Sequence, residues 1–107
     1  MEPVEINAGS WYLRALRADD RVDDRPALAD LGETDPAYVS ACTRDWLEER
    51  RYTWAVCEPT TGEMLAEVIL DPHDGTLGAR IRTGHDDAAR TAQDAVRRFA
   101  QGALGLL

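Results

Sequence analysis

The 107-residue sequence contains no lysine; its 12 basic residues are all arginine, set against 20 acidic residues for a net charge of -8. Nucleic acids and anionic membranes are bound through clustered positive charge, so we expect neither as a partner. No apolar run approaches the roughly 20 residues that a membrane-spanning helix needs. Residues 1–10 are polar and acidic, unlike a secretory signal. These absences predict an acidic cytoplasmic protein.

Cysteine is also scarce. Cys42 and Cys57 are too few and too far apart for a zinc knuckle or a CxxC redox pair, so we expect no metal site. In a reducing compartment they should be two small buried apolar side chains. A catalytic cysteine would need a histidine beside it. His73 and His85 could approach one only through the fold, and the sequence leaves that alternative open.

The length fits one domain over residues 1–107 with a core of its own. Residues 11–17 alternate between two faces, which predicts a strand. Residues 20–31 predict one or two short helical turns, with Pro26 in a first turn and a glycine just past the end. Asp35 and Pro36 predict the start of a longer helix that runs to about Arg51, with its apolar stripe at residues 38, 42 and 46.

The second half of the chain predicts a meander followed by a helix. Residues 52–57 and 64–70 are rich in strand-forming side chains and flank a turn, and residues 76–83 predict a third consecutive strand. Apolar residues at helical spacing follow from Ala88, with an aspartate as the expected cap and an end near Gly102. The order predicts an α+β fold with an antiparallel sheet of about four strands and about three helices.

Several strings, in this order, resemble the GNAT superfamily of acyl-CoA-dependent N-acetyltransferases, and in particular its ribosomal-protein N-acetyltransferase-like branch. They are residues 12–14 (Tyr-Leu-Arg), 17–20 (Arg-Ala-Asp-Asp), 54–56 (Trp-Ala-Val), 58–63 (Glu-Pro-Thr-Thr-Gly-Glu), and Phe99 with 102–106 (Gly-Ala-Leu-Gly-Leu). The resemblance implies the N-terminal half of that fold. Relatives continue beyond a string like residues 102–106 into elements that help to form the acyl-CoA cleft, so we expect a truncated GNAT-like domain.

The resemblance also implies a place for the acyl-CoA pyrophosphate, a glycine-containing turn at a helix start. Here that stretch, residues 86–93, reads Asp-Asp-Ala-Ala-Arg-Thr-Ala-Gln and has no glycine after Gly84. Asp86 and Asp87 would repel a pyrophosphate by about 1 kcal/mol or more per pair at close range. The loop is therefore degenerate, and we expect no bound cofactor.

Six residues are candidates for a site. Glu67, flanked along its strand by apolar residues, matches a strand glutamate that can act as general base in the family, and His85 at a helix start is a second possible base. Arg80 and Arg82 share one strand face, either as an anion-binding pair or as partners of the many carboxylates. Gly84 and Arg90 complete the expected cofactor-binding set, although Arg90 equally fits a surface helix.

Two functions follow from these patterns. The first is a degenerate GNAT-like protein without acetyltransferase activity, which acts as a binding or assembly module or serves a small-molecule task that needs no CoA. The alternative is an acetyl-CoA-dependent transferase whose cleft a second chain completes. In both cases the strand at residues 76–83 ends the sheet, and with the apolar tail at residues 104–107 it predicts a homodimer or a partner chain.

Overall fold

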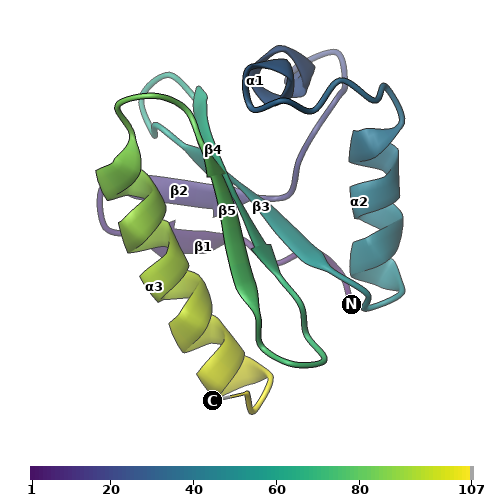
Figure 1. Cartoon of the computed structure of the whole chain (residues 1–107), viewed down its shortest axis with the longest axis vertical. Helices are drawn as coiled ribbons and strands as arrows, with labels where there is room; N and C mark the ends of the chain where they lie inside the picture. Colours follow the sequence, from purple (N-terminus) through teal and green to yellow (C-terminus); the bar gives the residue numbers. More distant parts are fainter. Residues whose placement is uncertain (107) are drawn as a thin grey trace.

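The computed structural model describes residues 1–106, which form a five-stranded antiparallel sheet and three helices (Figure 1). The strands are β1 (Ile6–Ala8), β2 (Trp11–Arg14), β3 (Tyr52–Cys57), β4 (Met64–Leu70) and β5 (Leu77–Ile81). The helices are α1 (Arg25–Asp30), α2 (Tyr38–Leu47) and α3 (Asp86–Ala103). Spatial order in the sheet follows chain order from β1 to β5. The predicted α+β fold is confirmed.

The sheet has one strand more than the four expected. Strand β1 lies in residues 1–10, whose polar and acidic composition does not predict a strand. It pairs with β2 through a tight turn at Gly9 and Ser10. Gly9 has a φ of +60°, a left-handed conformation that suits glycine in such a turn. The alternation of Ile6 and Ala8 is too short to reveal the strand by pattern alone.

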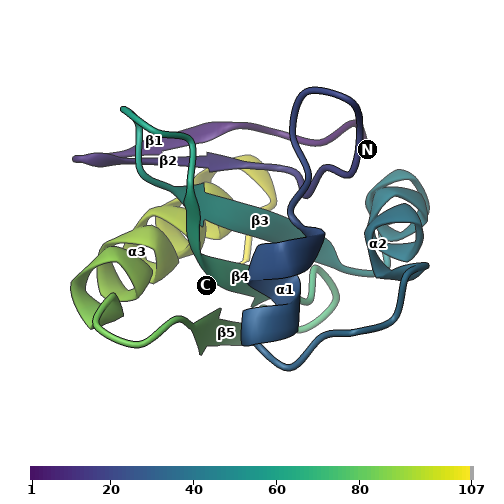
Figure 2. The same cartoon turned by 90° about the horizontal axis from the view of Figure 1, so that it is seen from above.

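The helices cover opposite faces of the sheet, with α3 on one side and α1 and α2 on the other (Figure 2). Every residue of β3 is buried, as expected of a strand covered on both faces. Trp54 and Val56 join the core under α3, whereas Ala55 and Cys57 join the core under α1 and α2. The second face is the one that holds the buried polar side chains described below.

Both ends of α2 differ from the prediction. Asp35 accepts a hydrogen bond from the Ala37 amide, but this closes a turn, and the helix begins only at Tyr38. The helix ends at Leu47 rather than near Arg51, because Glu49 takes a left-handed φ of +59°. The chain can then turn directly into β3.

Helix α3 follows its predicted span but not its predicted cap. Its N-cap is His85, and Asp86 and Asp87 lie in the first turn, where carboxylates favour the positive end of the helix dipole. Beyond the helix, Leu104 and Leu106 pack against the core, so this part of the apolar tail is partly covered; Leu107 lies outside the described residues. No helix within residues 1–106 is both long and apolar enough to cross a membrane.

Candidate functional site

The only glutamate with a fully buried side chain among the described residues is Glu67, in the middle of β4. Its position opposite Ala55 of β3 and Arg80 of β5 directs it to the face covered by α1 and α2. Tyr38 Oη donates to one carboxylate oxygen at 2.5 Å, and Arg80 Nε donates to the other at 2.6 Å. The carboxylate is therefore paired and hydrogen-bonded, as a buried charge must be.

Arg80 connects this carboxylate to the segment between α1 and α2. Its guanidinium also donates to Glu33 at 3.1 Å and lies 5.2 Å from the centre of the Tyr38 ring, within cation–π range. The hydrogen bond to Glu67 raises the pKa of Arg80 above its ordinary value. Burial, and then the hydrogen bond to Glu67, raise the pKa of Tyr38. Tyr38 is thus held as a neutral donor at physiological pH.

This geometry limits what Glu67 can do chemically. A general base must reach the proton that it removes, directly or through one water molecule. Glu67 has no exposed surface, and each of its oxygens already accepts a hydrogen bond from the protein. Access to an amine would require Tyr38 or Arg80 to move away first.

Arg82 points to the same side of the sheet as Arg80 but has different partners. It donates to Asp30 of α1 at 2.7 Å, to Glu63 at 3.1 Å and to the Met64 carbonyl at 3.0 Å. Arg82 and His85 line a polar cavity of about 420 Å³ that includes the same two carboxylates. Both arginines are thus ion-paired to carboxylates of the chain, which was one of the two interpretations that the sequence left open.

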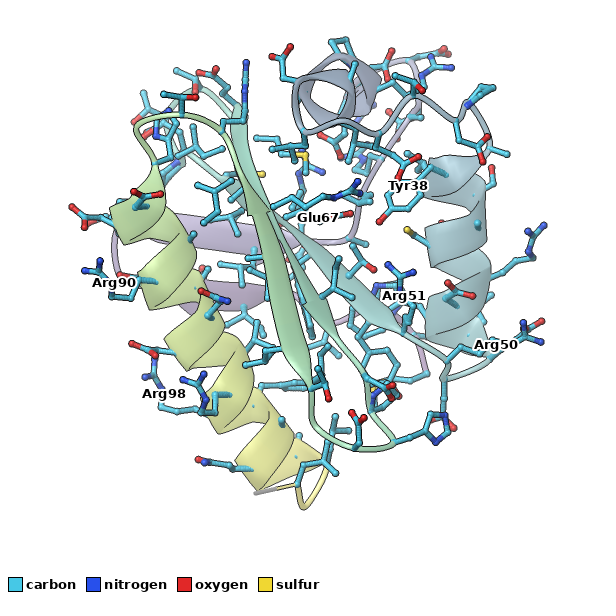
Figure 3. All side chains as sticks on the ribbon, in the orientation of Figure 1. Tyr38, Arg50, Arg51, Glu67, Arg90 and Arg98 are labelled. Carbon is cyan, nitrogen blue, oxygen red and sulfur yellow. The ribbon has the colours of Figure 1, made fainter. Side chains whose placement is uncertain are left out.

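The remaining predicted cofactor-binding residues lie at the start of α3. Gly84 has a φ of +88° in the turn between β5 and α3. Arg90 projects from the outer side of α3 (Figure 3), with its side chain 73% exposed and 3.5 Å from Asp87. The structure therefore brings Glu67 together with Arg80, and Arg82 together with His85, while Arg90 stands apart from both.

The sequence pattern does not assign Tyr38, Glu33 or Arg51 to this site. The spacing of residues 38, 42 and 46 places Tyr38 on the apolar stripe of α2, and nothing in that spacing predicts that its hydroxyl contacts Glu67. Arg51 Nη2 lies 3.5 Å from the Tyr38 hydroxyl, at the edge of the same cluster. These contacts join residues up to 47 positions apart, so only the register of the sheet and the placement of α2 reveal them.

The two cysteines lie on the same face as Glu67 and are both free and buried. Burial raises the pKa of Cys42, and it raises the pKa of Cys57 to about 11. Thiols in this state are poor nucleophiles. Within residues 1–106 no group of three or more His, Cys, Asp or Glu side chains is arranged to hold a metal ion.

Comparison with known proteins supports the fold. No family profile matches the sequence, and no curated protein matches it significantly. Among solved structures, a "putative ribosomal-protein-serine acetyltransferase" from Vibrio cholerae is similar, with a TM-score of 0.81 and 19% identity, over 99% of this chain and 72% of that one. An acetyltransferase from Agrobacterium tumefaciens str. C58 is similar with a TM-score of 0.65 and 19% identity, over 99% and 71%. The chain therefore has the GNAT-like fold that its sequence resembles.

Proposed function

We propose that this protein is a GNAT-fold module that does not transfer acetyl groups by itself and that acts by pairing the outer edge of β5 with another strand. The simplest partner is a second copy of the same chain, related by a two-fold axis. The observation that carries the proposal is the free outer edge of β5. Among residues 1–106, this strand pairs with β4 alone.

The register identifies the backbone groups that this edge offers. The Arg82 amide donates to the Leu65 carbonyl of β4, so alternate residues of β5 direct their backbone groups toward β4. The backbone N–H and C=O groups of Leu77, Ala79 and Ile81 point away from β4, toward the open edge. Ile81 is 40% exposed, one of two large apolar side chains with this much exposure in the described part of the chain. An edge of this kind is a template for strand pairing.

Edge strands are often protected by charged side chains. Two cations lie at this edge, Arg80 of β5 and Arg82 just beyond it. Arg80 pairs with Glu67 of β4 and with Glu33, and Arg82 pairs with Asp30 of α1. Their charges are thereby largely neutralised. Within residues 1–106, the edge therefore has no unpaired cation to oppose an incoming strand.

The absence of transfer activity is supported by Glu67 and by the start of α3. The carboxylate of Glu67 is covered, and both its oxygens are engaged. Two aspartates occupy the helix turn where the family resemblance would place a pyrophosphate. We expect no release of free thiol from acetyl-CoA above background with amines or peptides as acceptors. Turnover well above background by the isolated chain would contradict this part of the proposal.

Light scattering tests the pairing. We expect the mass of a dimer, and we expect Ile81→Lys to reduce it to that of a monomer by placing a charge on the edge. Leu47→Lys is a matched control, because Leu47 is the other exposed large apolar residue and lies at the end of α2. A monomeric wild-type protein, or equal effects of the two lysines, would contradict edge pairing.

A second candidate is an acetyl-CoA-dependent transferase whose cleft another chain completes. The observation that favours it is the close match in fold to the Vibrio cholerae protein, together with the left-handed Gly84 at the start of α3. Acetyl-CoA should then raise the melting temperature of the assembled protein, because a ligand that binds only the native state stabilises it. A melting temperature unchanged at millimolar acetyl-CoA would exclude this candidate.

A further inference from the structure

Arg51 stands out among the arginines of the described chain. Five arginines are at least partly buried, and four of them, Arg14, Arg17, Arg80 and Arg82, form ion pairs with carboxylates. Arg51 forms none within residues 1–106, and its buried Nε has no hydrogen-bond partner there. A buried donor that lacks an acceptor destabilises the fold. Arg51 therefore carries a polar group that the described residues leave unsatisfied.

The one hydrogen-bond partner of Arg51 within residues 1–106 does not supply a counter-charge. Arg51 Nη2 reaches only the Tyr38 hydroxyl, at 3.5 Å, and that hydroxyl already donates to Glu67. The charge of Glu67 is in turn paired with Arg80. Figure 3 shows Arg51 pointing into the space between the sheet and α2, whereas its neighbour Arg50 points outward from the molecule.

A cavity of about 340 Å³ is lined by Arg51 and by residues of β4, β5 and the turn between them. Ile69 of β4 and Leu77 and Gly78 of β5 contribute apolar surface to it. A Cβ added at Gly78 would meet no atom within 4 Å, so the glycine leaves open space in the wall. Arg51, Asp71 and Asp74 are the charged residues of the lining. A concave site that combines apolar surface with a few placed polar groups is the usual form of a small-molecule site.

We propose that this cavity binds a small monocarboxylate with an apolar body, whose carboxylate pairs with Arg51 and whose body packs on Ile69, Leu77 and Gly78. A guanidinium matches a carboxylate through two parallel hydrogen bonds. The proposal is independent of edge pairing, since its charged group, Arg51, immediately precedes β3, which is an inner strand of the sheet.

The surrounding charges favour a monocarboxylate over a phosphate. Asp71 and Asp74 also line the cavity. Asp71 accepts a hydrogen bond from the His73 amide, and Asp74 accepts one from the Thr76 amide. These bonds hold both carboxylates in the turn between β4 and β5. A phosphate carries up to two negative charges and meets more repulsion from these aspartates than a single carboxylate does.

The test is a titration of the ¹⁵N-labelled protein, followed by NMR, with three probes. These are 3-phenylpropanoate, its neutral amide and inorganic phosphate. We expect saturable shifts of the Gly78 and Ile69 amides with the carboxylate, at a Kd of about 1 mM as is typical of a fragment-sized ligand. No saturable shift below about 20 mM, or equal or tighter binding of the amide or of phosphate, would overturn the proposal.

Variants assign the binding to Arg51. We expect Arg51→Gln to raise the Kd at least about tenfold. Arg50→Gln, a change of the exposed neighbour that pairs with Glu48, should leave it within about twofold. If the Arg51→Gln variant binds 3-phenylpropanoate with the same Kd as the Arg50→Gln variant, the proposal is overturned. If the Arg51→Gln variant fails to fold, the Gly78→Val variant tests the site instead. Valine is β-branched, which suits a strand, and its side chain would fill the cavity. Weaker binding of 3-phenylpropanoate by Gly78→Val would support the site, and unchanged binding would refute it.

Discussion

Replacement of Arg80 by methionine tests whether the buried Glu67 cluster stabilises the fold. The change removes one of two hydrogen bonds to Glu67 and its only ion-pair partner among the described residues, while the carboxylate stays fully buried. Loss of one partner from a buried ion pair costs about 3–5 kcal/mol. The Arg80 side chain is 30% exposed, so water screens part of the interaction. We therefore expect a loss of about 2–3 kcal/mol in the free energy of unfolding.

Urea unfolding followed by tryptophan fluorescence measures this loss, which corresponds to about 10–20 °C in melting temperature for a domain near 100 residues. Arg97→Met is the matched control, because Arg97 forms an exposed pair with Asp94 at 3.0 Å; it should cost less than about 0.5 kcal/mol. The double variant Glu67→Leu with Arg80→Met removes both charges and should cost less than the sum of the single changes, by at least about 1 kcal/mol. If the free energy of unfolding of Arg80→Met lies within about 0.5 kcal/mol of the wild-type value, the reasoning is refuted.

Three further predictions concern individual groups. Tyr38→Phe removes the other hydrogen bond to Glu67 and should cost about 1.5–3 kcal/mol in urea unfolding; a change below about 0.5 kcal/mol would show that this bond contributes little. The amides of Val22 and Arg21 and the Arg17 side chain lower the pKa of Asp19 to about 2. The contribution of Asp19 to stability is therefore present above pH 3.8 and lost as the pH falls through about 2. Asp19→Asn should then destabilise the protein at pH 7 but not near pH 2. An equal loss of stability at both pH values would contradict this assignment. Burial raises the pKa of Cys57 to about 11 and also raises the pKa of Cys42. A thiol reagent at about pH 8 should therefore modify neither cysteine until denaturant is added. Rapid reaction of the native protein would show that the thiols are accessible.

The sequence predicts the elements of this fold well where the pattern is local. The alternation of the strands and the helical spacing after Ala88 are set by side chains within a few positions of one another. The helix limits near Asp35 and Glu49 were less well predicted, since a left-handed residue at position 49 ends α2 without a glycine to announce it. Strand β1 was missed because three residues are too few to show a period.

The candidate site was predictable only in part. Glu67 stood out because it interrupts an apolar strand, and Arg80 because it alternates on the next one. That these two side chains bind each other follows from the register between β4 and β5. The role of Tyr38 depends on where α2 packs. Arg51 is unpaired because, among the described residues, the fold places no carboxylate within ion-pair distance of it. Neither has a signature in the residues around it.

The mass of the wild-type protein in solution tests the central claim most directly. Light scattering at micromolar concentration should give about 24 kDa, twice the chain mass of 11.9 kDa, if β5 pairs with the same strand of a second copy. The Ile81→Lys variant should give about 12 kDa under the same conditions, and Leu47→Lys should remain at the dimer mass. A wild-type mass near 12 kDa that does not change with concentration would contradict the account.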